Sequence, residues 1–244
     1  GQVDIHIYDE ERKLSVKADA TKPVLAKAVR ELLKVSPTAA QAILDHQDAA
    51  TAIDSSVNPP YVPKRAAIER MEELWDLPAI SGLGDVERLR VKQLLQADAT
   101  AYTDGSVNVN TADPAVLTAL FEAAFVDPAQ GASLAQSVVE YRWDPGDSAD
   151  VAGGNRIVEL APQVRGEPND VPEPPMKTQL TQSLGSLGTL LTVGSNRFTI
   201  IAEGATANPV VKYRVTAVVE RRTKAQPSVE LGGETFRVLA WKEG

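Results

Sequence analysis

Hydrophobic and polar positions alternate at the start of the chain. Val3, Ile5 and Ile7 are each separated by one more polar residue, which is the period of a strand that buries one face. Charged residues at 9–12 offer a turn, and apolar positions resume within Leu14–Val16. The opening of the chain therefore predicts a β-hairpin.

Between residues 23 and 142 the spacing changes to that of amphipathic helices. Several segments start with proline, which suits a first helical position because its missing N–H group would be unpaired there anyway. A proline-rich loop at 55–63 interrupts them. In two of the segments, Ile68, Leu74, Val86 and Leu89 lie on stripes expected to be buried. We predict helices over 23–32, 37–46, 64–75, 85–95, 114–124 and 129–142.

Alternation returns in the last third of the chain. Strands are predicted at 198–202, 211–219 and 236–241, with a glycine turn before the last. Strands at both ends with helices between them predict an α+β protein, whose antiparallel sheet is built from both chain ends and carries an inserted all-helical domain. The expected domains are 1–16 and 177–244 for the sheet and 17–176 for the insertion.

Composition narrows the classes of function. The 244 residues include 25 Lys and Arg against 33 Asp and Glu, and the formal charge of −8 argues against a sequence-independent nucleic-acid binder. Cysteine is absent, so the sequence can form neither a disulfide nor a thiolate metal site. No stretch reaches the roughly 20 apolar residues of a membrane span.

The two histidines, His6 and His46, are the candidates for acid–base chemistry. The sequence holds neither a Gly-x-Ser-x-Gly nor a Ser-x-x-Lys motif, so a position on a strand face and one at a helix end are favoured over catalysis. We therefore expect a protein that is not an enzyme. Trp241, near the end of the last predicted strand, is a candidate for a partner interface, because tryptophan is enriched at such surfaces.

The segment Asn108–Ala112, followed later by Val139–Arg142, resembles the helix-hairpin-helix signature found in DNA-binding proteins and in secretion proteins. In DNA binders the hairpin offers backbone amides to a phosphate. Here the hairpin at 125–131 contains Asp127 and a proline, and no lysine occurs between 108 and 166. A DNA-binding module of a DNA-uptake system is therefore the alternative rather than the main hypothesis, and no nucleic-acid partner is expected.

Over nearly its whole length the chain resembles the minor pseudopilin K family of type II secretion systems, also called general secretion pathway protein K. The resemblance rests on the opening Ile7–Leu14, the proline-rich junction before a helix ending near Leu83, the Val107–Ala112 element and the final Arg237–Lys242. It implies a pilin-like sheet with a large inserted helical domain of helix-hairpin-helix or SAM-like type.

The same resemblance implies a function and a location. Such proteins cap the tip of the secretion pseudopilus together with other minor pseudopilins, of the I and J types, during protein export across the outer membrane. An N-terminal hydrophobic helix, absent from this sequence, would anchor the periplasmic domain in the bacterial inner membrane.

Family members have been seen with calcium, although none of the chemistry above requires a cofactor. The stretch from Trp143 to Pro175 has seven acidic residues against two basic ones, and calcium favours several oxygen ligands from a flexible loop. The spacing is not that of an EF-hand, so a solvated acidic loop is the competing interpretation. The candidate ligands are Asp144, Asp147, Asp150 and Asn155.

Overall fold

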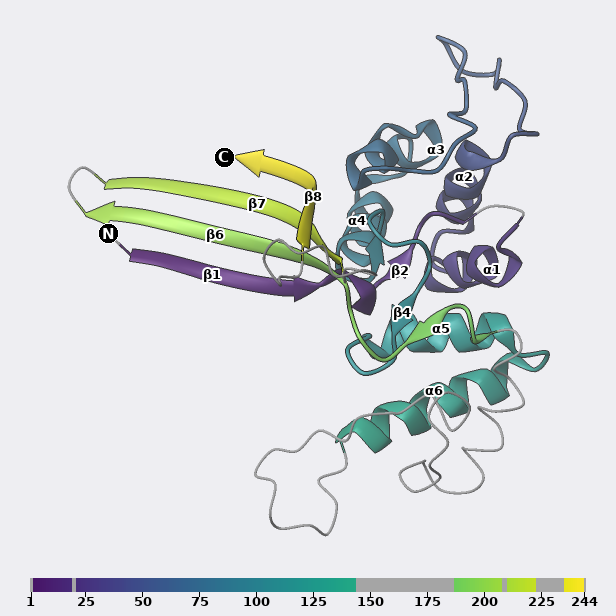
Figure 1. Cartoon of the computed structure of the whole chain (residues 1–244). Coiled ribbons are helices and arrows are strands. Elements are labelled where there is room, and N and C mark those ends of the chain that lie inside the picture. Colours follow the sequence, from purple (N-terminus) through teal and green to yellow (C-terminus); the bar gives the residue numbers. More distant parts are fainter. Residues whose placement is uncertain (1, 19–20, 144–186, 208–209, 223–234, 244) are drawn as a thin grey trace. The chain divides into compact units, whose positions relative to one another are not determined.

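The computed structural model describes residues 2–18, 21–143, 187–207, 210–222 and 235–243. Two compact units are present, one formed by the chain ends (1–11 and 194–244) and one by residues 12–193. The domain boundaries expected from the sequence, after residues 16 and 176, remain predictions. Figure 1 shows the strands of the first unit and the helices of the second.

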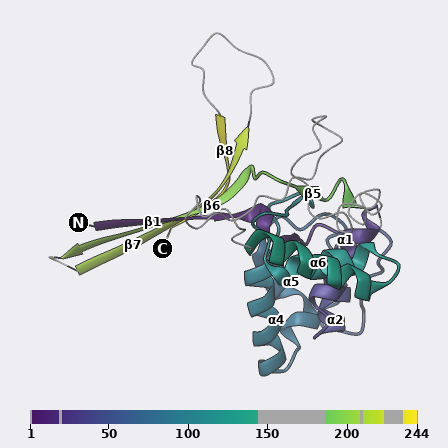
Figure 2. The same ribbon diagram turned by 90° about the horizontal axis from the view of Figure 1, so that it is seen from below.

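The chain ends build one four-stranded antiparallel sheet, with the strand order β1-β6-β7-β8. Both views show β1, β6 and β7 running side by side (Figures 1 and 2). Strands from the first and last parts of the chain therefore belong to the same layer, as the sequence predicted. The strands are β1 (Gln2–Asp9), β6 (Arg197–Ala207), β7 (Val210–Arg222) and β8 (Thr235–Glu243).

The second unit is mainly helical. Each of its described α-helices except α4 begins at a proline. The sequence predicted such proline starts for several helices. Within the described ranges, no helix combines the length and the apolar composition needed to cross a bilayer. The helices are α1 (Pro23–Leu32), α2 (Pro37–Gln47), α3 (Pro78–Ser81), α4 (Asp85–Asp98), α5 (Pro114–Ala124) and α6 (Pro128–Trp143).

Two short parallel strand pairs also belong to this unit, which is therefore not all-helical. β2 (Leu14–Ser15) pairs with β3 (Ala99–Thr100), and β4 (Val107–Asn108) pairs with β5 (Leu191–Thr192). β2 leads into the helix pair α1–α2 and β4 leads into α5–α6. The chain thus uses the same arrangement twice, and α1 packs against α5.

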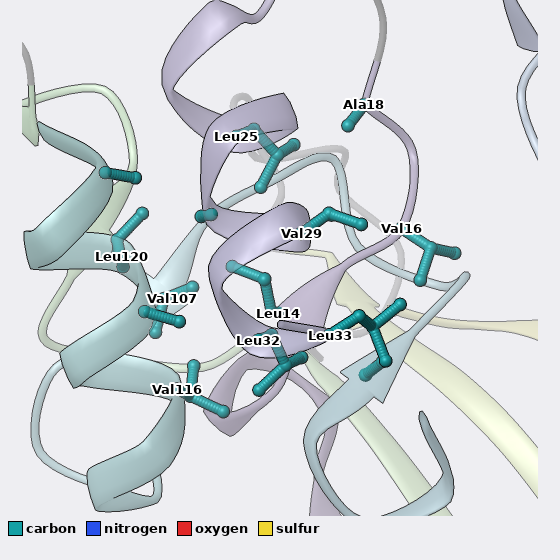
Figure 3. Close-up of a cluster of buried hydrophobic side chains, with 14 of the residues drawn as sticks. Leu14, Val16, Ala18, Leu25, Val29, Leu32, Leu33, Val107, Val116 and Leu120 are labelled. Atoms are coloured by element: carbon teal, nitrogen blue, oxygen red, sulfur yellow. The ribbon is translucent and has the colours of Figure 1, made fainter. Parts of the chain in front are cut away.

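The core of the helical unit joins the two arrangements. Leu14 and Val16 follow the first strand of the sheet in sequence, yet both are 1% exposed and lie beside Val29 of α1 (Figure 3). Val116 and Leu120 enter the same cluster from α5. Burial of aliphatic side chains of this size contributes about 1.5–3 kcal/mol each, so this cluster is a main source of stability for the unit.

The predicted opening hairpin is wrong. Asp9 ends β1 by accepting the backbone amide of Glu11 through Oδ1 at 2.8 Å, and the 3₁₀-helix η1 (Glu10–Arg12) follows. Such a local side-chain bond offers the backbone an alternative to a strand ladder. The pair Leu14–Ser15 then joins β3 rather than β1.

The helix predicted over 64–75 is also wrong, although Ile68 and Leu74 are buried as expected. The backbone amide of Ile68 donates to Gln47 Oε1 at 3.1 Å, and the Glu73 carboxylate accepts the amides of Glu69 and Arg70. These amides are therefore taken by side chains, and only the 3₁₀-helix η2 (Met71–Asp76) forms.

Helix α4 forms where it was predicted, but its expected buried stripe is wrong at the start. Val86 is 85% exposed and Leu89 is 56% exposed, and every residue from 85 to 90 at the start of the helix is exposed. Burial begins at Val91 and continues at Leu95.

Candidate functional site

Eight large side chains on one face of the four-stranded sheet are each between 49% and 66% exposed. We call this surface the apolar sheet face. Soluble proteins rarely leave large contiguous apolar patches in contact with water unless the patch binds something. The members of the apolar sheet face are Val3, Ile5, Ile7, Val211, Tyr213, Phe236, Val238 and Trp241.

The register of the strands places these residues on the same face. Ile7 pairs with Ile200, Ile200 pairs with Ala217, and Ala217 pairs with Trp241. Directly opposed residues of antiparallel strands point to the same side of the sheet. This row therefore crosses the sheet from the edge strand β1 to the edge strand β8.

A β-bulge completes the apolar sheet face. Trp241 and Val238 are three residues apart, so a regular strand would turn them to opposite faces. The pairing between β7 and β8 shifts between Val218 and Val219, which adds one residue to β8 at that point. As a result, Val238 lies opposite Val219 on the same face as Trp241.

Two aromatic residues of this face, Tyr213 and Trp241, share one acceptor. The indole Nε1 of Trp241 donates to the Glu243 carboxylate at 2.9 Å, and the Tyr213 hydroxyl also bonds to Glu243. The bond from Tyr213, followed by that from Trp241, holds the pKa of Glu243 below its usual value. Both aromatic residues thus keep their polar groups paired while their rings stay exposed, which is typical of interface aromatics.

The opposite face of the sheet is polar by comparison. Arg214 and Glu203 form an ion pair at 3.5 Å, and the ring of His6 stacks on that of Tyr8 with centroids 6.4 Å apart. The sequence predicted that His6 lies on a strand face, and the structure confirms it. The alternation at Val3–Ile7 also predicted the strand, but as a half-buried one, because sequence alone does not show whether the apolar side is covered.

His46 ties two segments of the helical unit together. Its Nδ1 atom contacts the Tyr61 hydroxyl and accepts the Lys64 amide at 3.5 Å. Burial lowers the pKa of His46, partly offset by Glu73. These contacts agree with the predicted helix-end role, since they connect the end of α2 to the loop that follows it.

The segment that the sequence likened to a helix-hairpin-helix, from Asn108 to the end of α6, is tied together by Arg142. Arg142 Nη1 donates to the carbonyl oxygens of Val109 and Ala112 at 3.0 and 2.9 Å. Asp113, directly before α5, makes no side-chain cap bond and forms an ion pair with Arg12 at 3.0 Å.

The turn between α5 and α6 presents an acid where DNA binders present amides. Asp127 Oδ1 accepts the backbone amide of Ala129 at 3.0 Å, and the Asp127 carbonyl accepts the amides of Gln130 and Gly131. A phosphate approaching this turn would meet a carboxylate and amides that are already engaged.

The predicted calcium ligands Asp144, Asp147, Asp150 and Asn155 lie outside the described residues. In the ranges that the structure covers, no group of three or more His, Asp or Glu side chains is arranged to hold a metal ion.

Comparison with known proteins identifies the fold. No protein-family model and no curated protein sequence matches the chain. Its structure is similar to a chain of the solved GspK-GspI-GspJ complex from the enterotoxigenic Escherichia coli type 2 secretion system. The TM-score is 0.56 at 17% identity, and the match covers 100% of this chain and 80% of that chain. The fold is thus the pilin-like α+β fold that the sequence predicted.

Proposed function

We propose that this protein is a non-catalytic minor pseudopilin of a type II secretion system that caps the pseudopilus tip. The observation that carries the proposal is the apolar sheet face on a pilin-like sheet. The fold likeness to a chain of the GspK-GspI-GspJ complex supports it. The partners would be minor pseudopilins of the I and J types, and the domain would lie in the periplasm of a bacterium.

The physical chemistry of the apolar sheet face favours a protein ligand. Burying apolar surface gains roughly 25 cal/mol per Å², and aromatic residues such as Trp241 and Tyr213 often dominate binding energy at interfaces. Their neighbours Ile5 and Ile7 add aliphatic area. A hydrophobic helix preceding residue 1 and the partner subunits would divide this surface between them, and that helix would anchor the protein in the inner membrane.

The alternative function, DNA binding through the helix-hairpin-helix element, is disfavoured by Asp127. Its carboxylate and carbonyl occupy the amides that would otherwise face a phosphate. Retention on duplex DNA that weakens with salt would support the alternative, because phosphate contacts release counterions.

Co-elution with candidate I-type and J-type minor pseudopilins from the same genome tests the proposal. Ile7→Lys and Trp241→Lys each place a charge on the apolar sheet face and are expected to weaken the complex by about tenfold or more. Tyr8→Lys is the matched control, because Tyr8 is the next residue of the same strand and faces the other side. No co-elution of the unchanged protein, or an equal loss with Tyr8→Lys, would contradict the proposal.

Calcium binding through Asp144, Asp147, Asp150 and Asn155 is a separate part of the proposal. Carboxylate and amide oxygens are suitable ligands for this ion. Titration calorimetry with calcium should give a saturable signal that Asp147→Asn weakens and that Asp170→Asn, in the same acidic stretch, leaves unchanged. An identical response from both variants would favour a solvated acidic loop.

A further inference from the structure

Strand β1 is an edge strand with little of the usual protection, since Asp4 is the one Asp, Glu, Lys or Arg among its exposed positions 2–8. In the described sheet it pairs with β6 alone, and every residue from Gln2 to Tyr8 is exposed. Its pairing with β6 runs without a register shift, and the strand contains neither lysine nor proline. Natural proteins usually protect an edge of this length with charges, prolines or bulges, because it can pair with another strand.

The opposite edge of the same sheet carries such protection. Strand β8 contains the bulge beside Val218 and Val219 and the exposed cations Arg237 and Lys242. The contrast matters because both strands belong to one sheet and meet the same solvent. A partner strand would therefore be accepted more readily at β1 than at β8.

The sequence of β1 is complementary to itself in one antiparallel register. If two copies pair with Ile5 opposite Ile5, then Val3 lies opposite Ile7 and Asp4 lies opposite His6. The Val3–Ile7 pair, which occurs twice, and the single Ile5–Ile5 pair fall on the apolar sheet face. The Asp4–His6 pair occurs twice and falls on the polar face. Opposed apolar pairs stabilise sheets, and the ring N–H of His6 can donate a hydrogen bond to the Asp4 carboxylate opposite it.

Neighbouring registers lose this complementarity. Centring the pair on Asp4 would place two Asp4 carboxylates opposite each other, and centring it on His6 would place Val3 opposite Asp9. A shift by a single residue would turn the apolar residues of one copy to the polar face of the other. The register centred on Ile5 is therefore the favoured one.

We propose that β1 pairs with β1 of a second copy of this chain, antiparallel and centred on Ile5, to form a continuous eight-stranded sheet. The two apolar sheet faces would then lie on the same side and form one larger surface. A single pair of edge strands buries less than the roughly 1,200 Å² of a standard interface, so the dimer is weak. Pairing at the edge leaves the proposed role of the apolar sheet face independent of this inference.

Charge exchange at two exposed positions tests the register. Asp4→Lys removes the complementary pair with His6, and His6→Glu places Glu opposite Asp4. Each variant alone should dimerise about tenfold more weakly than the unchanged chain in sedimentation equilibrium at high micromolar concentration. The double variant Asp4→Lys, His6→Glu should recover dimerisation, because Lys and Glu face each other in both pairs.

Mixing the two single variants gives the decisive result. In a mixed dimer Lys faces Glu in one pair and Asp4 faces His6 in the other, so the mixture should dimerise about tenfold more tightly than either variant alone. Lys242→Glu changes a charge on the other edge strand and should leave dimerisation unchanged. A monomeric unchanged chain, a loss with Lys242→Glu equal to that with Asp4→Lys, or no recovery on mixing would overturn the proposal.

Discussion

Arg142, at the end of α6, donates from Nη1 to the carbonyl oxygen of Ala112 at 2.9 Å, although 30 residues separate the two. The same nitrogen reaches the carbonyl oxygen of Val109 at 3.0 Å. Arg142 is only 6% exposed. Burial lowers the pKa of its guanidinium, and the nearby Asp113 carboxylate partly offsets this. One side chain thus fixes the turn before α5 to the end of the helix that follows it.

Replacing Arg142 should therefore destabilise the helical unit. Arg142→Met keeps most of the aliphatic volume but leaves two carbonyl oxygens without this donor, which should lower the free energy of unfolding by about 2–4 kcal/mol. Urea denaturation followed by circular dichroism measures the change. Arg90→Met, on an exposed position of α4, is the control and should change the free energy by less than about 0.5 kcal/mol.

Gly131 allows α5 and α6 to approach closely. A Cβ atom at this position would press against the carbonyl group of Phe121 and lie 2.8 Å from the backbone nitrogen of Glu122. Gly131→Ala should therefore lower the free energy of unfolding by about 1–3 kcal/mol, despite the higher helix propensity of alanine. Gly84→Ala has open space around the added atom and should cost less than about 1 kcal/mol. If thermal denaturation shows the same loss of stability for Gly131→Ala and Gly84→Ala, then α5 and α6 can move apart to accommodate the added methyl group.

Gln47 binds the backbone of the segment 64–75, which was predicted to be a helix, by accepting the amide of Ile68. Its side chain is 6% exposed; Nε2 donates to the carbonyl oxygens of Val16 and Ile43, and Oε1 accepts the Ile68 amide. Gln47→Met would leave these groups without their partner and should cost about 2–4 kcal/mol.

Limited proteolysis provides a second measurement for the Gln47 prediction. Cleavage between residues 48 and 70 should become faster in Gln47→Met, because Ile68 is released from α2. The control Gln41→Met changes an exposed position of the same helix. Faster cleavage in the control as well would assign the effect to α2 rather than to the buried amide.

Asp98 should make the stability of the helical unit depend on pH. Burial and then the nearby Asp113 raise the pKa of Asp98 above its usual value, and Arg12 and Lys13 offset this in part. The folded state therefore binds this proton more tightly than the unfolded chain does. Ionisation of Asp98 costs stability progressively as the pH rises from the unfolded pKa through the raised folded pKa.

Asp98→Asn should consequently increase the free energy of unfolding at neutral pH, and the gain should shrink as the pH falls through the raised pKa of Asp98 and vanish below about pH 4. Denaturant melts at several pH values measure this difference between variant and unchanged protein. Glu87→Gln, at an exposed position of α4, should show no such trend. A gain that persists at low pH would mean that the carboxylate is not the cause.

Local sequence patterns predicted the elements whose formation depends on nearby residues. Pro23, Pro37 and Pro114 marked helix starts, and alternation located β6 and β7, because proline geometry and strand period are local properties. The helix expected over 64–75 failed since Gln47, about twenty residues earlier, binds the Ile68 amide. Val86 was misassigned because amphipathic spacing shows which side could be buried, not whether a partner element lies there.

The sequence by itself determined the class of this protein: the order of strands, helices and strands, the pairing of both chain ends in one sheet, and the alternation that gives β1 an apolar side. Only the tertiary structure decided that Leu14 leaves the sheet for the helical core, that a bulge turns Val238 and Trp241 to one face, and that this face is exposed. The reason is physical. Periodicity is written into neighbouring residues, whereas register shifts, burial and long-range hydrogen bonds depend on segments brought together only by folding.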